Sequence, residues 1–458
     1  MLKKSTGSYD EFGRRLDKVP AIPEGDPSAT TSTIGSPATQ QQIYLTAMPL
    51  RTNDWVASSS RYILRVSWLQ PPVMTYEYVY IYDHEPPPAG SEAGDNYYNW
   101  ARVYWYDAND KDQEASYLFA DGGPVGNLDT LNGFWAAYVQ YVNGKYYVAA
   151  RAKFQVQKPN WMANVYRDRA AWGNLQLNQI LLPGTHDSGT FDMVDRGIPN
   201  NYSQTQTLNF TRMLNAGVRW LDIRMGYYPS FETGKEGPFF TVHSTYGSWT
   251  AWQTALTDIA KWMAATPTEI VFINFKWEGP TSSKVSIIKN ANGEDEWVWE
   301  ESLKTRVLKE SYEALKQFGV LPRDRHATIT VKEMIQEPYR VVLATPSTYD
   351  PLGVGSDPIC PGADYDWFDK YYIKELLPEL TQSLSKARTW MWAAGTVLTP
   401  HKYDGTIPWG VYGLTTDAID YMNRWIRVTA NHLNVVPVDF IETNVALALV
   451  EEFNKARA

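Results

Sequence analysis

The chain of 458 residues contains a single cysteine, Cys360. One thiol excludes an intrachain disulfide framework and a cluster of thiolate metal ligands. No apolar run reaches the roughly 20 residues that a membrane-spanning helix needs, and the lysines of Met1 to Asp10 precede no apolar stretch. We therefore expect a soluble protein without a Sec-type signal peptide, which is cytoplasmic, exported by another route or numbered without its leader.

Positive charge and phosphate-binding loops are also scarce. The chain has 42 Lys and Arg against 51 Asp and Glu, a net charge of -9, which argues against nucleic acid as a partner and against strong attraction to anionic lipid. No Gly-rich loop of the dinucleotide or Walker type occurs, so a nucleotide cofactor is not indicated. The abundant component is aromatic, at 14%, which fits thick β layers, sugar-like ligands or a membrane interface.

Two N-terminal segments differ in pattern from the rest of the chain. Residues 1–42 are rich in Ser, Thr, Pro, Gly and Gln, which is typical of a flexible tail. Residues 43–158 look all-β, because tyrosines recur with period two from Tyr76 to Tyr82 and Asn143-Gly144 joins two strand-like runs. We expect a β-sandwich-like module there. Its tyrosines either bind sugar or lipid or, more simply, form core and one aromatic outer face.

Lys158-Pro-Asn160 marks the change to a third segment, residues 159–458, in which strand-like and helical runs alternate. Such alternation over about 300 residues predicts a parallel α/β arrangement and favours a barrel over an open sheet. The predicted strands are Gln179–Leu182, Val218–Met225, Phe239–His243, Glu269–Phe275, Arg340–Ala344, Trp390–Ala394 and Val435–Phe440. The predicted helices are Leu208–Ala216, Trp252–Ala265, Glu301–Phe318, Tyr371–Ser385, Thr416–Leu433 and Ala446–Lys455.

Ionisable residues stand where three of these strands end: His186-Asp187 follow the first, Asp222 and Arg224 lie in the second, and His243 ends the third. In a parallel barrel these ends meet on one face. Two histidines across a cleft can take and deliver a proton, as cleavage of a phosphodiester by a neighbouring hydroxyl requires. An arginine between them would neutralise the phosphate oxygens. Each signal alone is weak, since His-Asp is commonly a loop feature and Asp-x-Arg a structural ion pair, but their order and spacing together are specific.

Four sequence blocks carry a resemblance to a known family. They are Pro183-Gly-Thr-His-Asp-Ser188, Gly217-Val-Arg-Trp-Leu-Asp-Ile-Arg224, Val242-His243 and Glu269-Ile-Val-Phe-Ile-Asn-Phe-Lys276. Over roughly residues 165–458 the chain resembles the X-region of phosphatidylinositol-specific phospholipase C of the bacterial type, and Val438-Asp439-Phe440-Ile441 is similar to the family's last barrel strand. The expected fold class is therefore an α/β distorted TIM-type barrel, incompletely closed, behind an all-β sandwich-like N-terminal domain.

The resemblance implies a role for each matched residue. His186 would be the general base that removes the proton of the inositol 2-hydroxyl, and Asp439 would orient it. His243 would be the general acid that protonates the diacylglycerol oxygen, with Asp187 assisting. Arg224 would stabilise the charge of the phosphorane. The products would be diacylglycerol and a cyclic inositol phosphate that the enzyme hydrolyses slowly.

Arg224 also bears on metal use. Family members that need calcium place a ligand at this position, and a guanidinium repels a cation, so the resemblance predicts a calcium-independent enzyme without a cofactor. Asp222 would help to hold the network. Phosphodiesterases on the same barrel and phospholipase D-like spider toxins bind magnesium through a Glu-x-Asp pair, whereas Leu221-Asp-Ile-Arg224 has one acid where two are needed. A metal-dependent phosphodiesterase remains an alternative.

Substrate-binding residues carry over by position. Lys276 stands where family members place a lysine near the inositol ring, and Asp369-Lys-Tyr371 resembles an Asp-x-Tyr that contacts the inositol hydroxyls and stacks on the ring. Asp369 would otherwise cap the helix that follows. The family strand equivalent to Arg340–Thr345 often ends with an arginine that binds an inositol hydroxyl, and this chain has Ala344-Thr345-Pro346 there. A substituted inositol, a glycan-linked one or a different polyol therefore stays open as the headgroup.

These observations predict metal-independent cleavage of phosphatidylinositol-like lipids by His/His acid-base catalysis. The partner would be a phospholipid substrate at a membrane surface, held peripherally by tryptophans of the barrel rim more than by charge. The acidic loop Glu294-Asp295-Glu296, with Trp297 and Trp299, is interpreted as a solvated insertion. A catalytically silent lipid- or glycan-binding protein is the alternative from another class, and the presence of both histidines, the arginine and the aspartates argues against it. The oligomeric state is not indicated.

Overall fold

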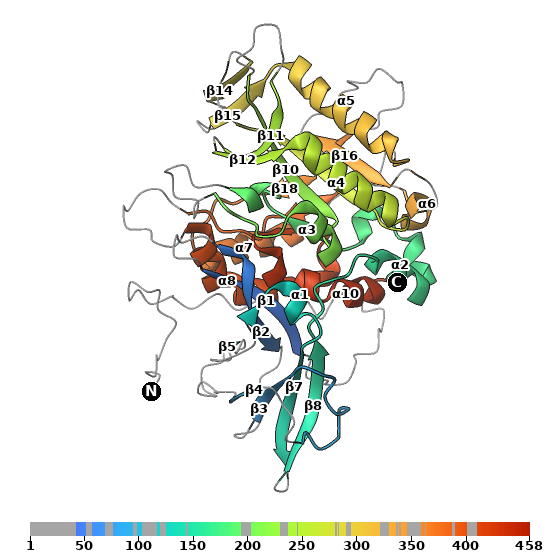
Figure 1. The fold of residues 1–458 in the computed structure, drawn as a ribbon, viewed down its shortest axis with the longest axis vertical. Coiled ribbons are helices and arrows are strands. Elements are labelled where there is room, and N and C mark those ends of the chain that lie inside the picture. Colours follow the sequence, from blue (N-terminus) through green and yellow to red (C-terminus); the bar gives the residue numbers. More distant parts are fainter. Residues whose placement is uncertain are drawn as a thin grey trace.

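The structure is a computed structural model of the chain (Figure 1). It describes residues 43–51, 57–68, 77–94, 99–102, 117–119, 125–142, 145–193, 203–229, 237–244, 246–279, 282, 284–289, 295–320, 329–335, 338, 340–345, 359–361, 363–386, 390–400 and 410–458. The predicted tail 1–42 and the turn Asn143-Gly144 lie outside these residues. The division of the chain near residue 158 stays a prediction.

Two antiparallel sheets form the N-terminal part. The first contains β1 (Ile43–Arg51), β2 (Ala57–Trp68), β5 (Tyr117–Phe119) and β6 (Val125–Gly126), and the second has the order β4 (Asn99–Arg102), β3 (Glu77–Tyr82), β7 (Trp135–Val142), β8 (Lys145–Lys153). The predicted hairpin is confirmed as β7 and β8, which pair along their length. Because β1 also contacts β7 and β8, the two sheets lie against each other.

The period-two pattern of β3 separates two buried faces. Val79 and Ile81 belong to the main hydrophobic core, whereas Tyr80 and Tyr82 pack in a separate small cluster. Ala93 belongs to this cluster, and its carbonyl accepts a hydrogen bond from the Tyr82 hydroxyl at 3.1 Å. These tyrosines are therefore covered by the chain's own loop, and the predicted aromatic outer face is wrong for Tyr80 and Tyr82, which are 6% and 1% exposed.

Eight parallel strands form the larger sheet, in the order β17-β16-β13-β10-β9-β20-β19-β18. Their bounds are β9 (Leu182–Thr185), β10 (Trp220–Tyr227), β13 (Val271–Trp277), β16 (Val341–Thr345), β17 (Ile359–Pro361), β18 (Asp364–Asp366), β19 (Trp392–Ala394) and β20 (Val435–Val438). The antiparallel pair β11 (Phe239–His243) and β12 (Tyr246–Ala251) adds to this sheet beside β10.

The two outermost strands of this sheet show how far it curves. β17 and β18 lie at opposite ends of the strand order, yet only residues 362 and 363 separate them in the chain. Their facing ends are therefore at most about 11 Å apart, which requires the sheet to curl round on itself. No hydrogen-bonded ladder joins β17 to β18 among the described residues, so the sheet is barrel-like and not closed by hydrogen bonds.

Helices cover the outside of the curled sheet. They are α2 (Trp161–Asp168), α3 (Phe210–Ala216), α4 (Trp252–Ala265), α5 (Glu301–Gln317), α6 (Val331–Ile335), α7 (Ile373–Leu384), α8 (Gly410–Thr429), α9 (Val445–Ala448) and α10 (Val450–Ala456), and α1 (Leu128–Leu131) precedes β7. The predicted strand Gln179–Leu182 is displaced, because Leu177–Gln179 forms a 3-10 turn closed by a reciprocal capping box with Gln176. Within the described residues no helix combines the length and the apolar character needed to cross a bilayer.

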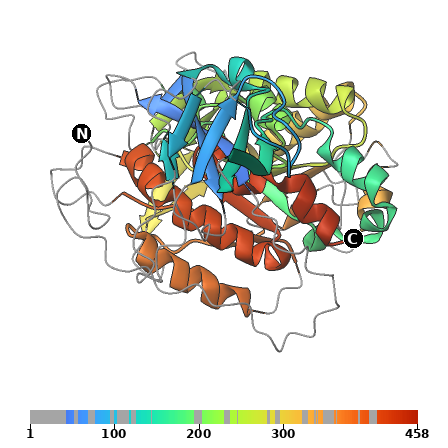
Figure 2. The same ribbon diagram turned by 90° about the horizontal axis from the view of Figure 1, so that it is seen from below.

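The main hydrophobic core runs from the antiparallel sheets into the barrel, since Leu45 of β1 and Leu447 of α9 belong to one cluster. β1 contacts α9 and the 3-10 turn η6 (Ile441–Thr443), and Figure 2 shows the blue and teal strands beside the red C-terminal helices. Many tryptophans among the described residues after 158 are buried in the protein. The most buried are Trp161, Trp172, Trp220, Trp252 and Trp425, at 1% exposure or less. The prediction that barrel tryptophans form an exposed rim is therefore wrong for these residues.

Candidate active site

Three of the predicted site residues lie at strand ends where the chain turns sharply. His186 follows β9, His243 is the last residue of β11, and Asp439 follows β20. Each is followed by a residue with positive φ: Asp187 (φ 43°), Ser244 (φ 56°) and Phe440 (φ 49°). L-residues rarely adopt this conformation, and such strain gathers at functional sites. The turns let each strand point a side chain into the site while the backbone leaves it.

The loop after β9 packs directly on the strand that carries the second histidine. An added Cβ at Gly189 would overlap the side chain of Thr241, so only glycine allows this approach. The two imidazole rings lie near each other in an edge-to-face arrangement, with centroids 6.3 Å apart and planes at 79°. The structure thus brings together His186 and His243, which are far apart in the sequence.

His186 is buried and held by Asp439. Its Nδ1 lies 2.8 Å from Asp439 Oδ1, and the two side chains are 6% and 2% exposed. Because a carboxylate accepts hydrogen bonds, the proton sits on Nδ1 and Nε2 stays free to act as a base. Burial alone would lower the pKa of His186, but the carboxylates of Asp187 and Asp439 outweigh it and raise that pKa.

Asp187 lies between the two histidines. Its Oδ2 is 3.5 Å from His186 Nε2 and 3.4 Å from His243 Nε2. Burial acts to raise the pKa of this carboxyl, but the neighbouring cations, Arg224 first, hold it below its usual range. Asp187 therefore presents a negative charge to both reactive nitrogens.

His243 is more open than His186, with a side chain that is 26% exposed. Its Nδ1 donates a hydrogen bond to the carbonyl of Ser203 at 2.9 Å. Since a carbonyl only accepts, Nδ1 carries a proton, and a second proton on Nε2 would point into the site. This arrangement suits a group that delivers a proton to a bound molecule.

Arg224 is surrounded by three carboxylates. Its guanidinium makes ion pairs with Asp187 at 2.6 Å, with Asp222 at 3.0 Å and with Glu278. Burial acts against its charge, but these carboxylates raise the pKa of Arg224 well above its usual value. Glu278 also accepts a hydrogen bond from the backbone N–H of Ser244 at 2.7 Å, which ties the residue after His243 to the same network.

Glu278 was not among the residues predicted from the sequence. It follows β13, whose Asn274 donates to Asp222 at 3.3 Å and whose Lys276 has its Nζ 3.9 Å from Asp222. Polar residues at 274, 276 and 278 alternate, and alternate residues of a strand share a face. This pattern could have identified Glu278. Burial and the proximity of Arg224 lower the pKa of Lys276.

Two aromatic side chains, Tyr365 of β18 and Trp367 directly after this strand, lie beside these groups. The Lys276 ammonium lies 3.9 Å from the ring centroid of Tyr365, and the ring of Trp367 lies 5.0 Å from that of His186 at 32°. Trp367 is 40% exposed, so part of its ring is open to a ligand while the ring also lies beside His186. Neither residue was predicted from the sequence, because β18 has three residues and Trp367 lies beyond its end.

Asp369 and Tyr371 contribute no atom to the contacts given above. Asp369 is exposed and has φ 47°, and Tyr371 packs edge-on against Tyr372 with centroids 4.7 Å apart. The alternative role of Asp369 as a helix cap is wrong, because α7 begins at Ile373 with Tyr372 as its N-cap. The substrate-binding role predicted for these two residues stays a prediction.

One group of side chains has the geometry of a metal site. His186, Asp187 and Asp222 each offer a ligand atom, and these atoms lie within 4.8 Å of one another. However, Arg224 already pairs with both carboxylates. A cation could bind there only if the guanidinium withdrew, so the residues present fit a fixed positive charge from the protein better than a metal.

Comparisons with known proteins agree with the resemblance found in the sequence. No family model matches the chain. The mouse PI-PLC X domain-containing protein 1 is 30% identical over 132 residues, covering 24% of this chain and 37% of that protein. The 1-phosphatidylinositol phosphodiesterase of Staphylococcus aureus (strain Newman) is 25% identical over 143 residues, covering 31% of this chain and 42% of that protein. The chain therefore spans less than half the length of these two relatives.

Solved structures give a similar picture of resemblance at low identity. The phosphatidylinositol-specific phospholipase C from Listeria monocytogenes matches with a TM-score of 0.46 and 16% identity, covering 66% of this chain and 99% of that chain. The predicted resemblance to this group of proteins is confirmed by the sequence relatives.

Proposed function

We propose that this chain cleaves the phosphodiester of phosphatidylinositol-like lipids without a metal ion, by acid-base catalysis between His186 and His243. The observation that carries the proposal is the position of Asp187, within 3.5 Å of the Nε2 atoms of both histidines, with the Arg224 guanidinium 2.6 Å from its other oxygen. A phosphate bound at this face would meet a base, an acid and a fixed positive charge together.

The proposed reaction moves one proton on each side of the phosphorus. His186 Nε2 takes the proton of the inositol 2-hydroxyl, whose oxygen then attacks phosphorus. The bond from phosphorus to the diacylglycerol oxygen breaks, and that oxygen receives the proton of His243 Nε2. Diacylglycerol and a cyclic inositol phosphate result. When water adds to the cyclic product, His243 takes a proton from the water and the protonated His186 gives its proton to the inositol 2-oxygen, which restores the starting protonation of both histidines. Arg224 and Lys276 would neutralise the charge that develops on the phosphorane.

The headgroup would lie against Tyr365 of β18 and Trp367, which follows this strand. Tyr365 sits under Lys276 and Trp367 beside His186, and flat faces of this kind pack against the C–H bonds of a polyol ring. Asp369 and Tyr371 remain proposed contacts of the ring hydroxyls. β16 ends in Ala344-Thr345, without the cationic side chain that would read one more hydroxyl, so a substituted inositol, a glycan-linked one or another polyol is a reasonable variant of the substrate.

Docking to the bilayer would use aliphatic side chains next to the site. Of the five large apolar side chains that are exposed among the described residues, Ile287, Ile288 and Val298 lie on one hairpin, formed by β14 (Val285–Lys289) and β15 (Asp295–Trp299). The hairpin leaves the site wall directly after Glu278, and Trp299 anchors it by donating to the Glu278 carbonyl at 2.9 Å. Trp299 itself is 2% exposed, so the interpretation of both loop tryptophans as solvated is wrong for it.

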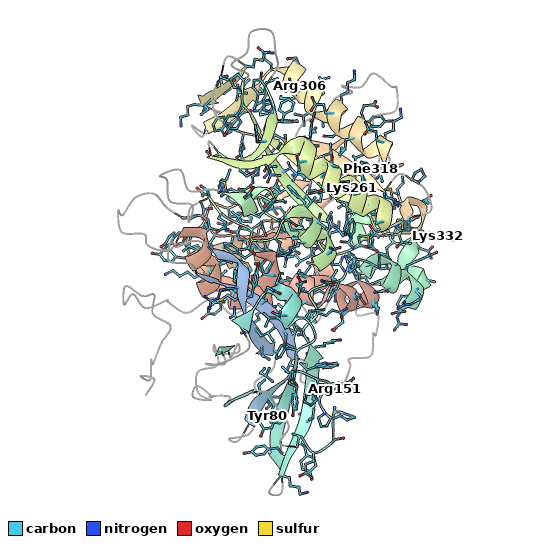
Figure 3. The ribbon with its side chains drawn as sticks, viewed as in Figure 1. Tyr80, Arg151, Lys261, Arg306, Phe318 and Lys332 are labelled. Carbon is cyan, nitrogen blue, oxygen red and sulfur yellow. The ribbon has the colours of Figure 1, made fainter. Side chains whose placement is uncertain are left out.

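The base of this hairpin is held by further contacts. Trp299 stacks on Phe239 with centroids 6.1 Å apart, and Arg306 of α5 lies 4.0 Å from the centroid of the same phenylalanine. Figure 3 places Arg306 at the opposite end of the molecule from Tyr80 of the antiparallel sheets. Apolar side chains on a fixed support can enter a lipid surface without the cost of ordering a loop.

The decisive experiment incubates the protein with phosphatidylinositol vesicles in excess EDTA and measures diacylglycerol. Release in EDTA is expected, with a bell-shaped dependence on pH, because one histidine must be neutral while the other is protonated. His186→Ala and His243→Ala should each lower the rate on the order of a thousandfold while the protein stays folded. Release only after addition of calcium or magnesium would favour the metal-dependent alternative. No release of diacylglycerol under either condition would refute the proposed enzymatic activity.

The docking proposal has its own matched control. Ile287→Ser with Ile288→Ser should weaken binding to zwitterionic vesicles, whereas Val428→Ser, which alters a 53% exposed valine on α8, should leave binding unchanged. Equal effects of the two changes, or binding that follows salt concentration alone, would contradict docking through this hairpin.

A further inference from the structure

One buried segment supports both histidines from behind. The carbonyl of Ser203 accepts the hydrogen bond of His243 Nδ1 at 2.9 Å. Three residues later, Gln206 Nε2 donates to the carbonyls of His186 at 2.9 Å and Val438 at 2.7 Å. The ends of β9, β11 and β20 are therefore fastened to the single segment Ser203–Thr207, all of which is buried.

The last residue of this segment is held by the N-terminal sheet. The Thr207 hydroxyl donates to the carboxyl of Glu442 in η6, and the Tyr62 hydroxyl of β2 lies 2.9 Å from the same Thr207 oxygen. Since Thr207 has one hydroxyl hydrogen and gives it to Glu442, Tyr62 is the donor in the other bond. Thr207 adjoins Gln206, which binds the His186 carbonyl, and Glu442 follows Asp439, which binds the His186 ring, by three residues. The side chains of Tyr62, Thr207 and Glu442 therefore link β2 to both of these contacts of His186.

This relay of Tyr62, Thr207 and Glu442 is isolated from water. The three residues are 0%, 3% and 2% exposed. Burial raises the pKa of Glu442 to about 7, although the hydrogen bond from Thr207 acts in the other direction. A buried carboxyl is costly for the fold, and a fully buried polar network fixes its partners in one geometry.

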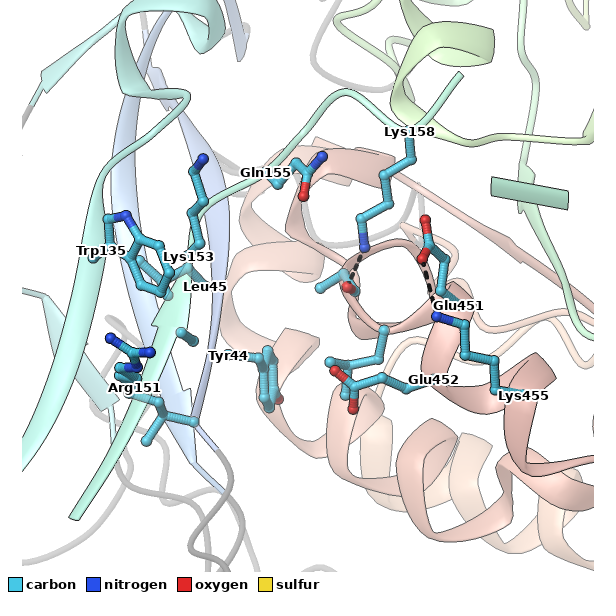
Figure 4. Close-up of a pocket in the computed structure, with 14 residues that line it drawn as sticks. Tyr44, Leu45, Trp135, Arg151, Lys153, Gln155, Lys158, Glu451, Glu452 and Lys455 are labelled. Atoms are coloured by element: carbon cyan, nitrogen blue, oxygen red, sulfur yellow. Dashed lines mark hydrogen bonds and ion pairs between the residues drawn. The ribbon is translucent and has the colours of Figure 1, made fainter. Parts of the chain in front are cut away.

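Elsewhere the contact between the N-terminal sheets and the barrel is loosely filled. A cavity of about 440 Å³ lies between β8 and α10, lined by Tyr44, Trp135, Lys158 and Glu452 among others (Figure 4). Lys158, at the predicted division of the chain, lines this cavity, and its ammonium donates to the carbonyl of Leu447 at 3.2 Å. Tyr62 supplies a different contact of this interface. Its hydroxyl is hydrogen-bonded to Thr207, which belongs to the segment that supports the two histidines.

We propose that Tyr62 is a positioning residue of the active site: through Thr207 and Glu442 the N-terminal β-sheet sets the distance between His186 and His243. The proposal rests on the proposed function, in which both histidines act. It makes the N-terminal sheet a part of the catalytic centre and assigns it a role other than binding a ligand of its own.

Two matched pairs of variants test the relay. Thr207→Val removes the central hydroxyl and keeps the shape, whereas Thr207→Ser keeps the hydroxyl. Tyr62→Phe removes one buried tyrosine hydroxyl, and Tyr82→Phe removes another from the same sheets, where Tyr82 is 1% exposed and bonded to Ala93. The measurements are kcat and KM on phosphatidylinositol in detergent micelles, thermal unfolding, and NMR titration of the two histidines.

Thr207→Val and Tyr62→Phe should each lower kcat about tenfold with KM near that of the wild type, since one buried hydrogen bond is lost from the transition-state geometry. Thr207→Ser should restore kcat, and Tyr82→Phe should lose stability but keep kcat. Equal kcat values for the two tyrosine variants, or for the two threonine variants, would overturn the proposal. If the wild type cleaves no phosphatidylinositol, the titrations still decide: unchanged histidine curves in Tyr62→Phe would overturn the relay by themselves.

Discussion

Two buried arginines lie five residues apart, Arg219 directly before β10 and Arg224 within it, and they have different surroundings. Arg219 is 0% exposed and pairs with one carboxylate, Glu269, at 2.6 Å. Its remaining donors go to backbone carbonyls, including Leu214 at 2.9 Å and Pro159 at 2.8 Å. Trp262 covers its face with the ring centroid 4.7 Å from Cζ. Every donor of this guanidinium is satisfied within the protein.

The guanidinium of Arg224, within β10, has different partners. Arg224 remains 12% exposed, and the partners that the structure gives its guanidinium are carboxylates. Backbone carbonyls cannot change charge or move, whereas carboxylates beside two histidines can respond to a proton or to a bound anion. The two arginines therefore differ in two respects: Arg219 is enclosed and most of its partners are backbone carbonyls, whereas Arg224 keeps a path to solvent and pairs with carboxylates. This difference is the reason for proposing a role in the reaction for Arg224 and a structural role for Arg219.

Exchanging each arginine for lysine should separate the two roles most strongly. Arg224→Lys keeps the charge but loses the planar fork, and kcat should fall on the order of 100- to 1000-fold with little change in stability. Arg219→Lys should keep kcat and lower the free energy of unfolding by about 3 kcal/mol, because the buried pair and its carbonyl bonds are broken. Steady-state kinetics and urea unfolding of both variants check this. Loss of stability without loss of rate in Arg224→Lys would erase the distinction.

Removal of one carboxylate from the catalytic end should have a smaller effect that depends on pH. In Asp439→Asn the imidazolium of His186 loses a neighbouring negative charge, so the pKa of His186, which Asp187 and Asp439 raise in the wild type, should fall. A base must be neutral, and the acidic limb of the pH–rate profile should therefore move to lower pH. We expect kcat at the plateau to fall about a hundredfold, because the amide no longer fixes the Nδ1 proton. An acidic limb that stays in place would contradict the assignment of His186 as the base.

The two glutamates provide the mildest contrast. Glu278→Gln should lower kcat about tenfold, since a neutral amide still accepts the Ser244 N–H but no longer pairs with Arg224. Glu269→Gln should leave kcat unchanged and destabilise the fold by about 3 kcal/mol, because it leaves the Arg219 charge buried without a counter-charge. The same kinetic and unfolding measurements apply, and a tenfold loss of kcat in Glu269→Gln would show that the two ends are coupled.

Much of the barrel and its charged centre was predictable from local patterns. His186, Asp187, Asp222, Arg224 and His243 were predicted as ionisable residues at or near the ends of apolar strand-like runs, and Asp439 and Lys276 from the family resemblance. The structure brings these residues together. The predicted bounds of α4 and β11 agree with the structure. These elements are long or strongly patterned, so the sequence alone contains enough information to place them.

What could not be predicted depends on contacts between distant segments. β17 and β18 have three residues each, which is too few for a periodicity. They are the two ends of the strand order, and only the curvature of the whole sheet brings them close together. Trp367 was missed because its importance arises from the ring of His186, which lies far away in the sequence. Tyr62 has the pattern of an ordinary core residue, and nothing in its neighbourhood along the chain predicts a bond to Thr207.

The residues with positive φ that follow His186, His243 and Asp439 also lower the free energy of unfolding of this protein. A non-glycine residue at positive φ costs on the order of 1 kcal/mol. Asp187 belongs to the charged network and Phe440 is 1% exposed in the core, so neither can change freely. Ser244 is the position where glycine would relieve the cost, and it adjoins His243. Among these three residues, selection for heat resistance would therefore act at Ser244, beside a proposed catalytic histidine, where a gain in thermal stability competes with catalytic rate.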